Sequence, residues 1–166
     1  MKTNFSPDFS IDKENRKITV KREFNASLEK VWAAWTQSEI LDKWWAPKPY
    51  KSETKSMDFS VGGSWIYAMV APDGMKHWSR ADYKSIKKLE SYSAQDAFCD
   101  ENGKITNDPP GSSWTNTFTD NGDTTTVLIE ITFDKTEDLE KHLEMGFKEG
   151  FTAGMENLDD IFASKK

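Results

Sequence analysis

The sequence predicts an α+β domain in which a curved antiparallel sheet of about six to seven strands wraps around a long C-terminal helix. Three observations predict it. Two short helical segments follow an early strand, segments with a period of two then recur as far as residue 133, and a helical pattern runs from Thr136 to the C-terminus. Packing the sheet around the last helix, with the two short helices closing one end, is the most economical arrangement of this order.

The first strand is expected over residues 17–24, where Ile18 and Val20 alternate with polar residues. Ser27 is expected to cap the first short helix, and the second is expected over residues 38–45, ended by two prolines. Residues 100–111, which contain Asn102-Gly103 and two prolines, are expected to form a loop. The remaining strands are expected at residues 55–59, 64–71, 75–87, 90–98, 113–119 and 124–133.

Residues 1–15 are polar and are expected to form a loose arm, which leaves residues 16–166 as a single domain. The net charge of −6 argues against a nucleic-acid-binding surface, because such surfaces are basic. No apolar run approaches the roughly 20 residues of a membrane span, and the N-terminus has no signal-peptide pattern, so a cytoplasmic location is expected. The single cysteine, Cys99, agrees with a reducing compartment.

No cofactor or metal is expected. The only histidines are His77 and His142, and no phosphate-binding, dinucleotide-binding or hydrolase motif is present. General acid–base catalysis needs only one or two placed groups, so it stays open, but no pair of residues stands out and no catalytic residue is assigned. The residues considered for that role are Asp58, Asp82, Asp96, Arg80 and Tyr83. The simpler interpretation of Asp58 is that it caps backbone amides in a turn. For Asp82 and Arg80 it is ion pairing with neighbours on the outer face.

Strand alternation predicts which side chains face the helix. The inward set consists of Trp65, Tyr67, Met69, Trp114, Asn116 and Phe118, while Thr115, Thr117 and Glu130 face outward. Asn116 is the polar exception among the inward residues of its strand. An aromatic lining with a few polar groups, here Asn116, Gln95 and Tyr67, is typical of a small-molecule site.

The expected C-terminal helix carries Gly146, Gly150 and Gly154, although each glycine inside a helix costs roughly 1 kcal/mol relative to alanine. Either another backbone approaches closely there, or space is kept for a ligand. Gly154 falls in the middle of the apolar stripe, together with Phe147 and Phe151. The abundance of aromatic residues favours the second explanation, with a gap at Gly154 beneath Trp65 or Trp114.

The chain also carries motifs that span residues 18–163 in a specific order. They are Val31-Trp32-Ala33-Ala34, Trp44-Trp45-Ala46-Pro47, Met57-Asp58-Phe59, Gly62-Gly63-Ser64-Trp65, Pro72-Asp73-Gly74, Ala81-Asp82-Tyr83 and Glu149-Gly150-Phe151. In this order they resemble the domain of the heat-shock protein 90 ATPase activator homologues, within the START-like, Bet-v-1-like (SRPBCC) superfamily. The resemblance implies a helix-grip fold with a cavity between the sheet and the C-terminal helix, and it links the chain to stress response.

Three functions stay open. The first is binding of a small apolar or amphipathic molecule in the cavity, the second is binding of a chaperone or other protein, as the resemblance implies, and the third is cyclase- or isomerase-type catalysis. A filled interior would favour the protein partner, and the chain is expected to be a monomer or a dimer. The residues expected to contact a ligand are Trp45, Trp65, Tyr67, Met69, Tyr83, Gln95, Trp114, Asn116, Phe118, Phe147, Phe151 and Gly154.

Overall fold

The computed structural model describes residues 7–106 and 111–163. Its single antiparallel sheet has eight strands in the order β1-β2-β8-β7-β6-β5-β4-β3. The strands are β1 (Asp8–Asp12), β2 (Lys17–Phe24), β3 (Lys51–Met57), β4 (Ser64–Val70), β5 (Lys76–Lys87), β6 (Ser91–Phe98), β7 (Ser112–Asp120) and β8 (Thr125–Thr132). The helices are α1 (Leu28–Thr36), α2 (Ser38–Trp44), α3 (Thr136–Glu144) and α4 (Phe147–Ala163).

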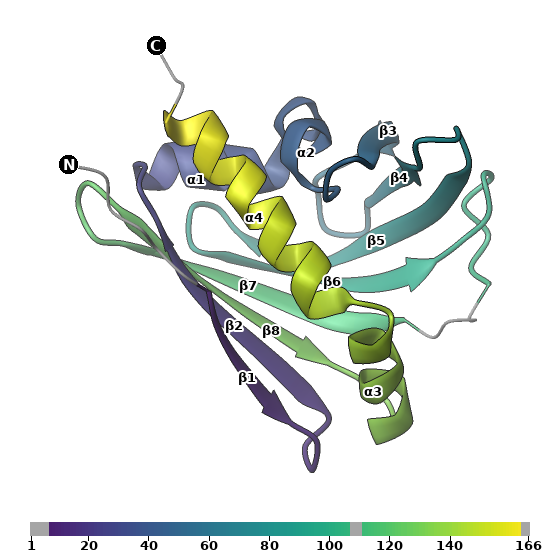
Figure 1. Cartoon of the computed structure of the whole chain (residues 1–166). Helices are drawn as coiled ribbons and strands as arrows, with labels where there is room; N and C mark the ends of the chain where they lie inside the picture. Colours follow the sequence, from purple (N-terminus) through teal and green to yellow (C-terminus); the bar gives the residue numbers. More distant parts are fainter. Residues whose placement is uncertain (1–6, 107–110, 164–166) are drawn as a thin grey trace.

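The sheet curves around α4, which runs diagonally across its concave face, while α1 and α2 cover one end (Figure 1). The predicted helix-grip architecture is therefore confirmed. The expectation of a loose N-terminal arm is wrong for residues 8–12, because these form β1 and pair in register with β2 at the edge of the sheet. Phe9 of β1 is half-buried against the core, whereas its neighbours Asp8 and Ser10 are exposed.

The C-terminal helix is interrupted at Gly146. This residue has a φ of +87°, in the left-handed region that favours glycine, so α3 ends before it and α4 begins after it. The prediction of one continuous helix from Thr136 is therefore wrong. The break lets α3 cover the far end of the sheet, where Leu139 is fully buried, and lets α4 start in a new direction across the concave face (Figure 1).

The helix α1 begins as predicted, with the Ser27 hydroxyl accepting a hydrogen bond from the backbone amide of Lys30. The helix α2 begins after Gln37, which caps it without a side-chain hydrogen bond. Two tryptophans, Trp35 on α1 and Trp44 on α2, are almost completely buried and contact each other edge to face with ring centroids 4.9 Å apart. This pair of indole rings forms the part of the core that α1 and α2 bury.

The helix α4 packs closely on the end of α2. A Cβ atom at Gly154 would lie 3.2 Å from the carbonyl oxygens of both Trp44 and Trp45, so this glycine allows close backbone contact. One turn further on, the Asn157 side-chain amide donates to the carbonyl oxygen of Ala46 over 3.1 Å. The position of α4 above the sheet is therefore set by backbone contact with residues 44–46.

Replacing Gly150 with alanine is expected to stabilise the protein by about 0.5–1 kcal/mol, because alanine is the better helix former. A Cβ atom at this position would meet only Pro47 Cγ, at the ordinary contact distance of 3.8 Å. Urea unfolding of G150A and wild type measures the difference. A decrease in the free energy of unfolding would show that α4 needs glycine here for another reason.

Candidate functional site on the concave face

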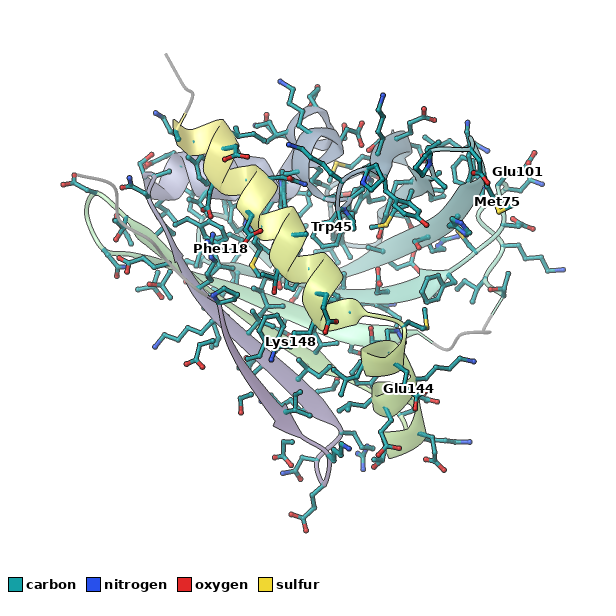
Figure 2. The ribbon with its side chains drawn as sticks, in the orientation of Figure 1. Trp45, Met75, Glu101, Phe118, Glu144 and Lys148 are labelled. Atoms are coloured by element: carbon teal, nitrogen blue, oxygen red, sulfur yellow. The ribbon has the colours of Figure 1, made fainter. Side chains whose placement is uncertain are left out.

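Most of the predicted site residues lie around Trp45, which follows α2 and lies beside the middle of α4 (Figure 2). Its ring is half-buried and touches rings from three different elements. The ring centroids of Trp65, Trp114 and Phe151 lie 5.6, 6.0 and 6.0 Å from that of Trp45. Phe147 completes this group, which we call the Trp45 cluster, with its centroid 6.0 Å from that of Trp114.

Tyr67 gives the Trp45 cluster a polar group. The indole N–H of Trp45 donates to the Tyr67 hydroxyl over 3.0 Å, and the ring of Tyr67 stacks on Trp65 with a centroid distance of 4.0 Å. Burial raises the pKa of Tyr67 far above its ordinary value, so the phenol stays neutral. Met69, the next inward residue of β4, is half-buried at the margin of the core.

The other predicted residues lie deeper, around Tyr92 of β6. Phe118 stacks on Tyr92 with ring centroids 6.1 Å apart, and Tyr83 contacts Tyr92 edge to face with ring centroids 6.0 Å apart. Asn116 faces Tyr92 directly across the β6–β7 pair and is 3% exposed. The inward face predicted for β7 is thus correct, and Asn116 brings an amide into an aromatic interior.

Two buried polar atoms in this interior have no hydrogen-bond partner among the described residues. One is the carbonyl oxygen Oδ1 of Asn116, an acceptor, and the other is the indole Nε1 of Trp35, a donor. Trp35 lies against the same residues, with its ring centroid 6.1 Å from that of Phe118. An unsatisfied buried donor or acceptor costs about 1–3 kcal/mol, so both atoms are suited to a polar group that enters from outside.

Asp96 also lies on the concave face. It has the same parity on β6 as the buried residues Tyr92 and Ala94, and it faces Ala81 on one neighbouring strand and Ser112 on the other. The carboxyl group is half-buried, and its burial, with a smaller contribution from Asp82, raises its pKa to about 7. Sequence reasoning weighed Asp96 only as an acid–base candidate, although the alternation of Tyr92 and Ala94 already indicates its inward direction.

Two of the predicted site residues are placed differently. Gln95 lies on the convex face, where its side-chain oxygen accepts a hydrogen bond from Ser113, so it cannot contact a molecule beneath α4. Gly154 meets the backbone of Trp44 and Trp45 instead of leaving a gap beneath Trp65 or Trp114. The first correction follows from the period of the strand, and the second from the packing of α4 on α2.

The polar residues of the convex face form local pairs, as their simpler interpretation predicted. The guanidinium of Arg80 donates to Asp82 over 2.7 Å, and the Ser64 hydroxyl donates to the same carboxylate. Burial alone would raise the pKa of Asp82, but these hydrogen bonds outweigh it and the pKa lies below its ordinary value. Asp58 lies in the turn before β4, where its carboxylate accepts a hydrogen bond from the Ser60 hydroxyl and not from the backbone amide expected of turn capping.

Two pockets open beside the helices, away from the Trp45 cluster. One, of about 420 Å³, lies between α1, α2 and the end of α4, and the other, of about 450 Å³, lies between α2, the start of β3 and Asn157. None of the predicted site residues lines either of them. Within residues 7–106 and 111–163, no group of three or more His, Cys, Asp or Glu side chains could hold a metal ion, and no helix is long and apolar enough to cross a membrane.

The model of the family described as "Activator of Hsp90 ATPase homolog 1-like protein" matches residues 25–163. The chain belongs to this family. The match includes α1, α2 and α4, the Trp45 cluster, Asn116 and Asp96, and it leaves out β1 and β2.

Solved structures with the same fold include proteins from three bacteria. A solution NMR structure from Arthrobacter aurescens has 27% identity and a TM-score of 0.89, with 95% of this chain and 92% of that chain covered. Protein Ms6760 from Mycobacterium smegmatis has 26% identity, coverage of 95% and 97%, and a TM-score of 0.86. A protein from Staphylococcus epidermidis has 26% identity, 95% coverage of both chains and a TM-score of 0.82. Comparison with curated proteins finds no match.

Proposed function

We propose that this protein binds a small apolar or amphipathic molecule on the concave face of its sheet, beneath α4, with Asn116 as the polar anchor. The observation that carries the proposal is the unpartnered carbonyl oxygen of Asn116, which is buried among aromatic rings. A ligand hydroxyl that donates to this oxygen would remove the cost of leaving it unpaired. The surrounding rings supply the apolar contacts that small-molecule sites ordinarily have.

The ring contacts around Trp45 imply that a ligand would have to displace side chains in order to enter. Trp45 touches rings from both the sheet and α4, so it occupies the space that a ligand would need. Trp45, Trp114 and Phe147 are each half-buried, whereas Trp65 and Phe151 are buried. Binding would therefore displace these outer rings, and the indole N–H signals of the tryptophans would report it.

Replacing Asn116 with leucine is expected to weaken binding of a hydroxylated aromatic probe, 2-naphthol, about tenfold, which corresponds to one lost hydrogen bond. The same change should raise the free energy of unfolding by about 1 kcal/mol, because it removes an unsatisfied buried oxygen. NMR titration of the indole N–H signals and urea unfolding measure the two effects.

The matched control for this test is Thr117→Val, which also replaces a polar side chain on β7 but does so on the convex face. It should leave the affinity for 2-naphthol unchanged. Naphthalene, which lacks the hydroxyl, should bind N116L and wild type equally. The proposal fails if 2-naphthol leaves the indole signals of Trp45, Trp65 and Trp114 unshifted, or if N116L binds it as tightly as wild type.

A second candidate function is binding of a protein partner. The packing of the chain's own rings around Trp45 favours it, because a filled interior leaves the outer surface as the place of interaction. The family's description points to heat-shock protein 90 as the partner to test. If this function holds, adding the purified protein will raise the ATPase rate of purified Hsp90, and an unchanged rate at saturating concentration would contradict it.

A further inference from the structure

Asp96 is the one charged residue of β6, and it faces the concave side of the sheet. Its carboxylate has no hydrogen bond or ion pair with any described residue. A half-buried carboxylate without a partner is costly, since buried charges are ordinarily paired or hydrogen-bonded. Neither the family match nor the role proposed for Asn116 accounts for it.

The nearest guanidinium along the sheet cannot serve as its partner. Arg80 lies on the adjacent strand β5 but points to the convex face, as the opposite parity of the buried residue Ala81 requires. There Arg80 donates to Asp82, to the Ser64 hydroxyl and to the carbonyl oxygen of Gly103. Its hydrogen-bonding capacity is therefore used on the far side of the sheet from Asp96.

Small side chains surround Asp96, and aromatic rings lie beyond them. Its cross-strand neighbours are Ala81 and Ser112, and the next inward residue on β6 is Ala94. Trp65 faces Ala81, and Trp114 faces Ala94. Trp114 is a diagonal neighbour of Asp96, about 7–8 Å away, and Trp65 lies in the same row one strand beyond Ala81, about 10 Å away. Both large rings can therefore contact a group that sits over the carboxylate.

A carboxylate bordered by aromatic rings is the usual recognition site for an organic ammonium ion. The cation is attracted both by the charge of the carboxylate and by the electron-rich faces of tryptophan and tyrosine, with a gain of about 0.5–2 kcal/mol per ring. The Tyr67 hydroxyl stays neutral and adds a further ring near Asp96. The overall charge of −6 also favours the approach of cations.

We propose that the concave-face site selects an organic cation, an amine or a quaternary ammonium group attached to apolar carbon, with Asp96 as its counter-ion and Trp65, Trp114 and Tyr67 as its aromatic neighbours. This inference rests on the proposed function, since it names the ligand class of the same site. It assigns separate roles to the two polar groups of the concave face. Asp96 binds the charge and Asn116 binds a hydroxyl.

The test compares choline with its uncharged isostere 3,3-dimethylbutan-1-ol, which has the same shape and the same hydroxyl. Choline is expected to bind wild type at least about tenfold more tightly, as judged from the indole N–H signals in an NMR titration. In D96N the affinity for choline should fall about tenfold, while that for the alcohol should stay within about twofold.

Glu130→Gln is the matched control, because it also removes one negative charge but does so on the convex face, where Glu130 pairs with Lys17. It should leave both affinities unchanged. Equal binding of choline and the alcohol to wild type, or an equal loss of choline affinity in D96N and E130Q, overturns the inference. If 2-naphthol still binds through Asn116 in that case, the proposed function stands and only the preference for cations fails.

Discussion

Gly154→Leu is expected to lower the free energy of unfolding by about 3 kcal/mol or more, which is severe for a domain of this size. A Cβ atom at this position already lies 3.2 Å from two carbonyl oxygens, those of Trp44 and Trp45. The rest of a leucine side chain would have to push α4 away from α2. The backbone there cannot yield freely, because Asn157 holds the carbonyl of Ala46 one turn further along.

Gly150→Leu is the matched control for that prediction, since it makes the same substitution one turn earlier on the same helix. There a Cβ atom meets only Pro47 at 3.8 Å, so the free energy of unfolding should change by less than about 1 kcal/mol. Urea unfolding with circular dichroism measures both variants. If G154L is as stable as G150L, the close contact between α4 and α2 is not what keeps position 154 a glycine.

The glycines also show where reasoning from sequence stops. Helical periodicity placed Phe151, Gly154 and Leu158 on one buried face, and all three are buried. The same periodicity predicted a helix that continues through Gly146. The sequence alone does not distinguish a glycine that ends a helix in the left-handed conformation from a glycine inside a helix. What Gly154 packs against depends on α2, which is more than a hundred residues away in the chain.

The strands likewise differ in how well the sequence predicts which side chains face inward. Alternation was sufficient to predict the inward faces of β4, β7 and β8, because β4 and β8 carry large apolar residues at every second position and β7 carries an aromatic residue on each side of Asn116. On β6 the inward residues are Tyr92, Ala94 and Asp96, so the apolar signal is weak and Gln95 was assigned to the wrong face. The strand β1 was missed because it is a polar edge strand whose pairing with β2 is decided by the hairpin.

Asp96→Asn is expected to stabilise the protein at pH 8 by about 2 kcal/mol, because it removes a half-buried, unpaired charge. The pKa of Asp96 is about 7 in the folded protein, against an ordinary value of 3.8. Between these two values the folded state holds a proton on Asp96 that the unfolded state has lost. The contribution of Asp96 to stability therefore falls as the pH rises from about 4 to 7 and stays at its low level above that.

The quantity to measure is the difference in free energy of unfolding between D96N and wild type at several pH values, because subtraction removes the titration of groups that both proteins share. The difference should be close to zero below about pH 3.8, where Asp96 is protonated in both states, and should grow to about 2 kcal/mol at pH 8. The buried tyrosines of β4, β5 and β6 do not titrate in this range, since burial raises the pKa of Tyr67, Tyr83 and Tyr92.

Asp82→Asn provides the opposite case on the neighbouring strand. The pKa of Asp82 lies below its ordinary value because of its hydrogen bonds to Arg80 and Ser64, so its ionised form stabilises the fold. The D82N variant should therefore be less stable than wild type at pH 8, and the loss should shrink as the pH falls through the carboxylate range. If D96N shows the same sign as D82N, the Asp96 carboxylate is stabilised within the free protein and needs no cation. If it shows the opposite sign, the protein keeps at position 96 a charge that weakens its fold, which is the pattern expected of a residue retained for binding.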